Sequence, residues 1–164
     1  LLVILLALAV LYDLRTYIIP NRLIATALVA GLAVSLVLGG IKGLLESFAA
    51  AVIPAAVLLA LFALRMLGAG DIKLLCSIGA IMGIKFVLYT MAYSFIAGGV
   101  LAVALMIFRG NVRFRFRNIG KYLMGCLYTG RLMPYSDFSN KNDGGKFHFS
   151  LAIAAGCLIN ILAN

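Results

Sequence analysis

Acidic residues are scarce in this 164-residue chain, which has only five of them: Asp13, Glu46, Asp71, Asp137 and Asp143. Charged residues of both signs make up 12% of the sequence, whereas hydrophobic residues make up 65%. A soluble domain of this size cannot bury so large an apolar fraction away from water. The apolar runs are continuous and lack the alternation of a membrane β-barrel. The composition therefore predicts an all-α, polytopic integral membrane protein.

Cysteine is also rare. The three thiols, Cys76, Cys126 and Cys157, form no Cys-x-x-Cys pair, so the sequence indicates neither a zinc site nor a disulfide framework. We expect no metal and no cofactor, and we interpret the thiols as apolar or reduced side chains. The run Leu1–Leu11 resembles the apolar core of a signal peptide, but no small-x-small cleavage site follows it. We interpret it as the remaining part of a first spanning helix.

About six apolar segments follow one another, and we expect residues 1–164 to form a single membrane-embedded domain. The segments cover residues 1–12, 23–38, 44–67, 72–83, 86–108 and 147–163. The first and fourth are short for a full span of about 20 residues. Gly39-Gly40 marks the end of the second segment, and Asn21 is a plausible N-cap at its start.

Basic residues gather in the loops that six spans would place on one side. The odd-numbered loops hold 12 of the 14 lysines and arginines, and the even-numbered loops hold only Lys42 and Lys85. The positive-inside rule places the odd-numbered loops in the cytoplasm. Asp13, which ends the first segment, and Asp71, which begins the fourth, are then predicted to share the cytoplasmic face.

The largest odd-numbered loop, at about residues 109–146, is strongly basic. Arginine and phenylalanine alternate over residues 113–117. One interpretation is an interfacial segment that binds anionic lipid headgroups, and the alternative is a solvated basic loop. Interleaved basic and aromatic residues also suit single-stranded nucleic acid, but we expect no nucleic-acid partner because the topology already accounts for the charge.

The two acids beside membrane-length segments, Asp13 and Asp71, are the candidate catalytic residues, since an ionisable group there is costly to bury. Two adjacent carboxyl groups share a proton, so one acts as a base and the other as an acid. Such a pair can activate water and protonate a leaving amine, as peptide hydrolysis requires. Two alternatives stay open from the residues alone. The acids could be ordinary interfacial groups, with Asp71 as a helix N-cap, or they could serve a small proton-coupled transporter or channel.

Two motifs carry a resemblance to a known family. The sequence Gly68-Ala69-Gly70-Asp71-Ile72-Lys73-Leu74 resembles the Gly-x-Gly-Asp signature of intramembrane aspartyl proteases, and its extension is similar to that of type IV prepilin peptidases. The stretch from Asp13 to Ile19-Pro20-Asn21 is similar to the first catalytic motif of the same family. Residues 147–156 are loosely similar to the closing helix of the family.

The resemblance implies an endopeptidase that cleaves the basic leader from prepilin-like precursors (pilins, pseudopilins or archaellins) at the cytoplasmic face of a prokaryotic inner membrane. It implies Asp13 and Asp71 as the catalytic pair, with Gly68 and Gly70 shaping the loop beside Asp71. Asp137 and Asp143, in the basic loop, are candidates for contact with the leader. Methyltransferase activity is not implied, because nothing in the chain matches the Cys-x-x-Cys domain of larger members.

Overall fold

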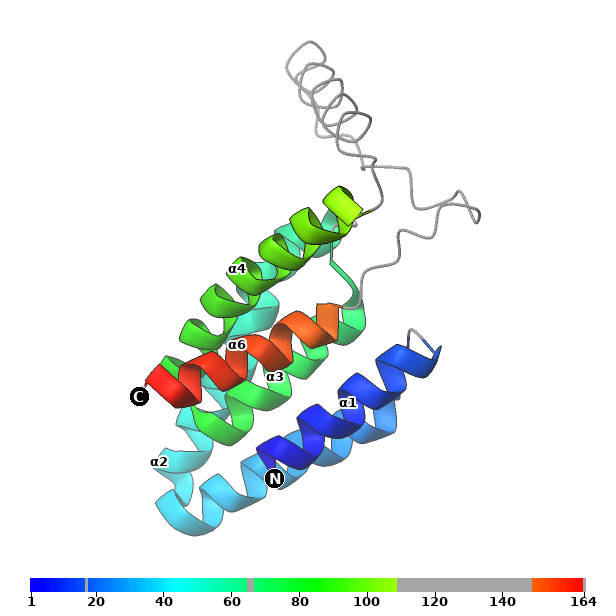
Figure 1. The fold of residues 1–164 in the computed structure, drawn as a ribbon. Coiled ribbons are helices and arrows are strands. Elements are labelled where there is room, and N and C mark those ends of the chain that lie inside the picture. The colour runs from blue at the N-terminus through cyan, green and yellow to red at the C-terminus, as the bar shows by residue number, and fades with distance from the viewer. Residues whose placement is uncertain (17, 65–66, 109–148, 164) are drawn as a thin grey trace.

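The computed structural model describes residues 1–16, 18–64, 67–108 and 149–163. These residues form α1 (Leu2–Thr16), α2 (Asn21–Ala63), α3 (Ala69–Met82), α4 (Ile84–Phe108) and α6 (Phe149–Ala163), with no strand in the described ranges. The helices pack into one bundle (Figure 1). The predicted all-α fold class is confirmed, while the predicted basic loop at about 109–146 lies outside the described residues.

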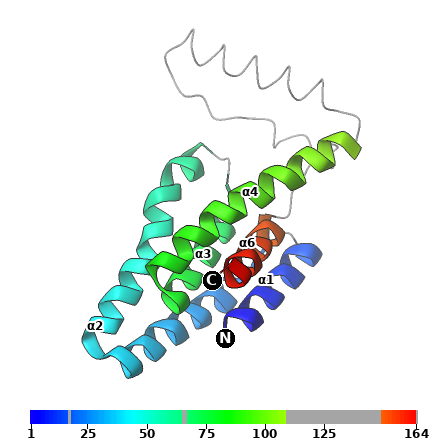
Figure 2. The ribbon, with the colours of Figure 1, turned by 60° about the vertical axis from the view of Figure 1, so that its left-hand side comes forward.

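Helix α2 has two arms that meet at a sharp corner, which is visible in Figure 2. Gly40 interrupts the helix with φ 61° and ψ −150°, a conformation that glycine adopts without a steric cost because it has no Cβ. Beyond the corner the arms approach closely, since a Cβ atom on Gly43 would lie 2.5 Å from the carbonyl oxygen of Ser35. The break predicted at Gly39-Gly40 is therefore present.

The two arms of α2 pack on α3, whose side chains are largely buried. The first arm runs parallel to α3: the Ser77 hydroxyl donates a hydrogen bond to the carbonyl oxygen of Ile24 at 3.2 Å, and Gly31 lies against the backbone of Ala80. On the second arm, Ser47 donates to the carbonyl oxygen of Ala80 at 2.6 Å. The first arm and α3 therefore begin at the same end of the bundle, and the second arm returns toward that end.

Small residues let the helix backbones come into contact. A Cβ atom on Gly79 of α3 would overlap the carbonyl oxygen of Ala50. On α6, a Cβ atom on Gly156 would lie 2.7 Å from the backbone nitrogen of Ser94 and 2.9 Å from the carbonyl oxygen of Thr90. Helices in lipid gain little from the hydrophobic effect and associate through such close contacts. The packing therefore fits the predicted membrane class.

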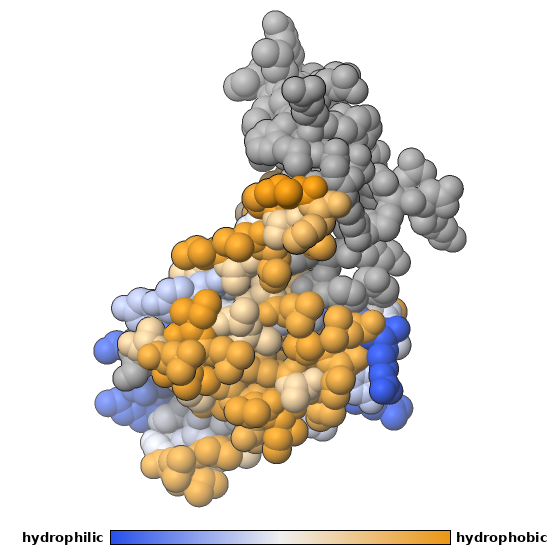
Figure 3. Space-filling view, viewed as in Figure 1, coloured by the Kyte–Doolittle hydropathy of each residue, from blue (hydrophilic) through white to orange (hydrophobic). Residues whose placement is uncertain are grey.

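The outer surface of the bundle is apolar. Large apolar side chains are exposed on α1, α2, α4 and α6, among them Val3, Val37, Val57, Ile96 and Leu162. Figure 3 shows an apolar face with hydrophilic residues at two opposite ends. Such a surface indicates contact with lipid or with a partner rather than with water.

Two helices in the described part of the chain are long and apolar enough to cross a membrane, namely α2 and residues 84–105 of α4. Helices α1 and α6 have 15 residues each and α3 has 14, fewer than the roughly 20 of a straight, complete span. The count of six spans stays a prediction.

Candidate active site

Asp13 and Asp71 come from two helices whose ends meet. Asp13 lies in the last turn of α1 and is 9% exposed, whereas Asp71 lies in the first turn of α3 and is half-buried. The two carboxyl groups are close enough to interact electrostatically. The fold thus brings together two acids that the sequence separates by 58 positions.

The start of α3 fixes the carboxyl group of Asp71. Gly68 is the N-cap, with extended backbone angles of φ −75° and ψ 144°, and the helix begins at Ala69. Asp71 is the third helical residue, and its carboxyl group accepts a hydrogen bond from the backbone N–H of Gly68. An acid at this position commonly reaches back in this way to satisfy the N–H group of the N-cap residue.

This geometry corrects three interpretations of the sequence. The helix begins at Ala69 and not at Ile72, because Asp71 satisfies a backbone donor one turn earlier and so supports the added turn. Gly70 therefore lies within the first helical turn and not in a loop. Asp71 is also not the N-cap residue, a position that belongs to Gly68, although its side chain does stabilise the helix start.

Gly68 leaves space beside the carboxyl group of Asp71, whereas Gly70 faces the side chain of Ile19. A Cβ atom on Gly68 would lie 3.0 Å from Oδ2 of Asp71, so any larger residue would press on that oxygen. A Cβ atom on Gly70 would lie 3.8 Å from the side chain of Ile19, which is ordinary van der Waals contact. Neither glycine has a positive φ. Gly68 is thus needed for its small size and not for an unusual backbone conformation, whereas the structure leaves room for a methyl group at Gly70.

Asp13 receives a hydrogen bond from α6. The residue lies in the last turn of α1, at the end of the helix where the unpaired backbone groups are carbonyl oxygens. The Ser150 hydroxyl, in the first turn of α6, donates to Oδ2 of Asp13 at 2.5 Å. That length is typical of an O–H donor on a carboxylate, and Ser150 is fully buried.

Sequence reasoning did not identify Ser150. The residue lies within the loosely similar closing segment, 147–156, but no motif marks it as part of the site. The available signal was a polar side chain at the start of an otherwise apolar helix, which needs a hydrogen-bond partner once it is buried. The partner itself could not be named, because Ser150 and Asp13 are 137 positions apart.

A second polar contact joins the two motifs. The ammonium group of Lys73 donates a hydrogen bond to Oδ1 of Asn21 at 2.9 Å, and both side chains are exposed. Asn21 was predicted to cap α2, but the N-cap is Pro20, and the Asn21 side chain instead accepts the hydrogen bond from Lys73. The start of α2 is thereby attached to α3 two residues after Asp71.

The three other acidic residues of the chain, of which only Asp137 and Asp143 were predicted to contact the substrate, fall into two groups. Glu46 is exposed and precedes Ser47, which bonds to Ala80, nine residues beyond Asp71 on α3. At 1.5 Å per residue, this separation is about 13 Å along the helix, so Glu46 is remote from the acid pair. Asp137 and Asp143 lie outside the described residues.

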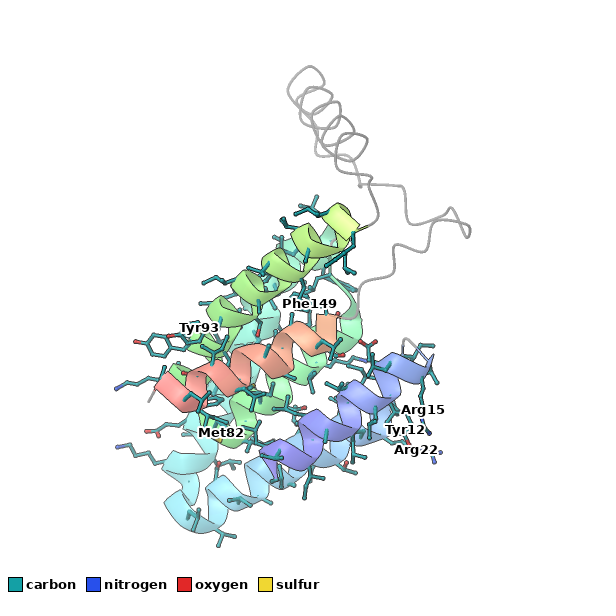
Figure 4. The ribbon with its side chains drawn as sticks, viewed as in Figure 1. Tyr12, Arg15, Arg22, Met82, Tyr93 and Phe149 are labelled. Carbon is teal, nitrogen blue, oxygen red and sulfur yellow. The ribbon has the colours of Figure 1, made fainter. Side chains whose placement is uncertain are left out.

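The side chains at the two ends of the bundle show at which end the acid pair lies. In Figure 4, Tyr12, Arg15 and Arg22 lie together at one end, near the end of α1, while Met82 and Tyr93 lie toward the other end.

Within the described ranges no group of three or more His, Cys, Asp or Glu residues could hold a metal ion. The chemistry that the site offers is that of two carboxyl groups, which can act together as general base and general acid.

Comparison with known proteins bears on the same residues. A family model described as "Type IV leader peptidase family" matches residues 1–103. The match covers more than half of the chain and includes both carboxyl groups and both glycines, but it ends before α6 and Ser150. No curated protein and no solved structure matches the chain.

Proposed function

The chain belongs to the type IV leader peptidase family, and from this membership and the site geometry we propose that it is a membrane aspartyl endopeptidase that removes the basic leader from prepilin-like precursors. The family is one of proteases of the aspartic type. The observation that carries the proposal is the meeting of Asp13 and Asp71 at the ends of two helices, within the region that the family model matches.

The proposed reaction uses both carboxyl groups. The ionised carboxyl group removes a proton from a water molecule, whose oxygen attacks the carbonyl carbon of the scissile peptide bond. The protonated carboxyl group then donates its proton to the leaving nitrogen as the carbon–nitrogen bond breaks. The products are a free carboxylate on the leader and a free amine on the mature protein. Each step needs only the acid–base chemistry of the pair.

The proposed substrate carries a short basic leader before an apolar helix, and the proposed place of cleavage is the cytoplasmic face of the inner membrane. The location of the site at the end of the bundle that holds Arg15 and Arg22 supports this orientation, because basic residues mark the cytoplasmic side. Asp137 and Asp143 are proposed to contact the leader, since they are the acids of a loop that is otherwise strongly basic. Proton-coupled transport by the same acids is not favoured by the family membership.

Co-expression with a prepilin tests the proposal. We expect the wild-type protein to convert the precursor to a faster-migrating product on a denaturing gel. Asp13→Asn and Asp71→Asn should leave the precursor uncut, and Glu46→Gln, which changes an acid remote from the pair, should cut normally. A precursor that stays full-length with the wild-type protein correctly inserted would contradict the proposal.

A further inference from the structure

We propose that Ser150 is a positioning residue for the reaction and that its hydroxyl group holds the carboxyl group of Asp13 in its working orientation. The inference rests on the proposed peptidase function. It concerns a residue outside the region that the family model matches. The motifs supply the two acids, and α6 supplies the contact that orients one of them.

The need for such a contact follows from the torsions of aspartate. Rotation of a carboxyl group about its last torsion is only weakly restrained, so an aspartate without a hydrogen bond samples a broad range of planes. The 2.5 Å hydrogen bond from Ser150 engages Oδ2 of Asp13 and so selects one plane. The bond is short, buried and formed to an acid, which is the kind of hydrogen bond that fixes geometry most strongly.

Ser150 can fix Asp13 only if α6 is itself held in place, and it is held by α4. Near its far end, Asn160 donates hydrogen bonds to the carbonyl oxygen of Phe86 at 3.0 Å and to Oγ1 of Thr90 at 3.2 Å. In the middle, Gly156 lies against the backbone of Ser94. These contacts set the register of α6 along α4 and therefore the position of its first turn.

The first turn of α6 is held as well. The rings of Phe149 and Phe95 are tilted against each other with centroids 5.8 Å apart, and a Cβ atom on Gly98 would lie 3.0 Å from the Phe149 ring. Phe149 directly precedes Ser150, and its ring lies at the start of α6, where the helix faces α4 (Figure 4). A rigid neighbour thus presents the hydroxyl group, as a positioned catalytic group requires.

The kinetic consequence is specific. Ser150 bonds to Asp13 and so acts on the chemical step, where a misplacement of about 1 Å can cost up to about 100-fold in rate. Removing the hydroxyl group should therefore lower kcat and leave KM little changed. If the hydroxyl group only stabilised the bundle, any variant that loses a buried hydroxyl group between helices should show the same loss of activity.

The test compares Ser150→Ala, Ser150→Thr and Ser47→Ala in the full-length protein purified in detergent. The probe is a synthetic precursor with a basic leader joined through glycine to an apolar helix. Ser47 is the matched control because it also makes a buried bond between helices, at 2.6 Å, remote from both carboxyl groups. We expect Ser150→Ala to lower kcat at least about tenfold with KM within about twofold. Ser150→Thr should restore most of the rate, and Ser47→Ala should resemble the wild type. Equal losses in Ser150→Ala and Ser47→Ala, or a change in KM alone, would overturn the role.

A spectroscopic measurement covers the case in which threonine does not fit the buried site. In an Asp71→Asn background labelled with ¹³C at the aspartate carboxyl carbons, Ser150→Ala should shift an infrared band of Asp13 that Ser47→Ala leaves unchanged. An unshifted band would overturn the proposal. The two proposals also fail differently. A wild-type protein that does not cleave the probe overturns the peptidase function, whereas normal cleavage by both the wild type and Ser150→Ala overturns only the role of Ser150.

Discussion

Ser150 of α6 and Asp13 of α1 are joined by a hydrogen bond of 2.5 Å, although 137 positions separate them in the chain. The bond connects the first helix of the matched region to a helix beyond it. Because Asp13 also interacts with Asp71, the ends of α1, α3 and α6 meet around one pair of carboxyl groups. The site therefore combines residues of three helices, α1, α3 and α6, that are far apart in the sequence.

The two glycines beside Asp71 should affect different kinetic parameters. Gly68→Ala places a methyl group 3.0 Å from Oδ2 of Asp71, so we expect the carboxyl group to move and kcat to fall. Gly70→Ala meets only ordinary contact with Ile19. We propose that the substrate backbone passes beside Gly70, so an added methyl group should mainly raise KM. Steady-state cleavage of the precursor by both variants measures the difference, and the reverse pattern would contradict it.

The contact between Lys73 and Asn21 should appear as an energetic coupling between the two motifs. The hydrogen bond of 2.9 Å is exposed, so its contribution should be small, about 0.5–1 kcal/mol. A double-mutant cycle with Lys73→Met and Asn21→Ala, followed by unfolding in detergent, measures this coupling free energy. Strictly additive losses of stability would show that the contact does not stabilise the protein.

Gly79 and Gly156 should be intolerant of alanine. A Cβ atom at either position would overlap a neighbouring helix, at Ala50 or at Ser94, and overpacking of this kind typically costs about 1–3 kcal/mol. Gly99→Ala is the matched control, because in the described part of the chain no atom outside its own stretch of helix lies within 4 Å of its Cβ position. We expect a lower unfolding temperature for Gly79→Ala and Gly156→Ala and no loss for Gly99→Ala. Equal behaviour of all three would refute the close packing of these helices.

The two ends of the bundle should face opposite sides of the membrane. A single cysteine that replaces Arg15 or Arg22 should react with an impermeant reagent only in inverted vesicles, because basic residues favour the cytoplasm. A single cysteine that replaces Lys42 or Lys85 should react only in right-side-out vesicles. The native Cys76, Cys126 and Cys157 are replaced by alanine in this background. Labelling of Arg22 and Lys42 from the same side would contradict the proposed topology.

Much of this arrangement could be predicted from the sequence, because the relevant signals are local. Long apolar segments predict helices, and the Gly39-Gly40 pair indicates the corner that the structure has at Gly40. The start of α3 was predicted three residues too late, since the glycines around Asp71 suggested a loop. The hydrogen bond between the Asp71 carboxyl group and Gly68 is what extends the helix, and composition does not reveal it.

The contacts between distant residues could not be predicted in the same way. The resemblance pointed to Asp13 and Asp71 because each lies in a recognisable motif. Ser150 and the partnership of Lys73 with Asn21 depend on how α6 and α2 pack in register. That register is set where Gly156 of α6 contacts α4 and where Gly31 of α2 contacts α3. A single sequence does not show which helices meet at a glycine.

The central claim is that Asp13 and Asp71 together cleave a prepilin-like precursor, and turnover by the purified protein tests it most directly. The synthetic precursor is incubated with wild type, Asp13→Asn or Asp71→Asn, and mass spectrometry of the product gives both the rate and the cleaved bond. We predict cleavage at the junction of leader and apolar helix by the wild type, and a loss of at least about 100-fold in each variant, the lower end of what one acid–base group contributes. Wild-type turnover by either correctly folded variant would contradict the account.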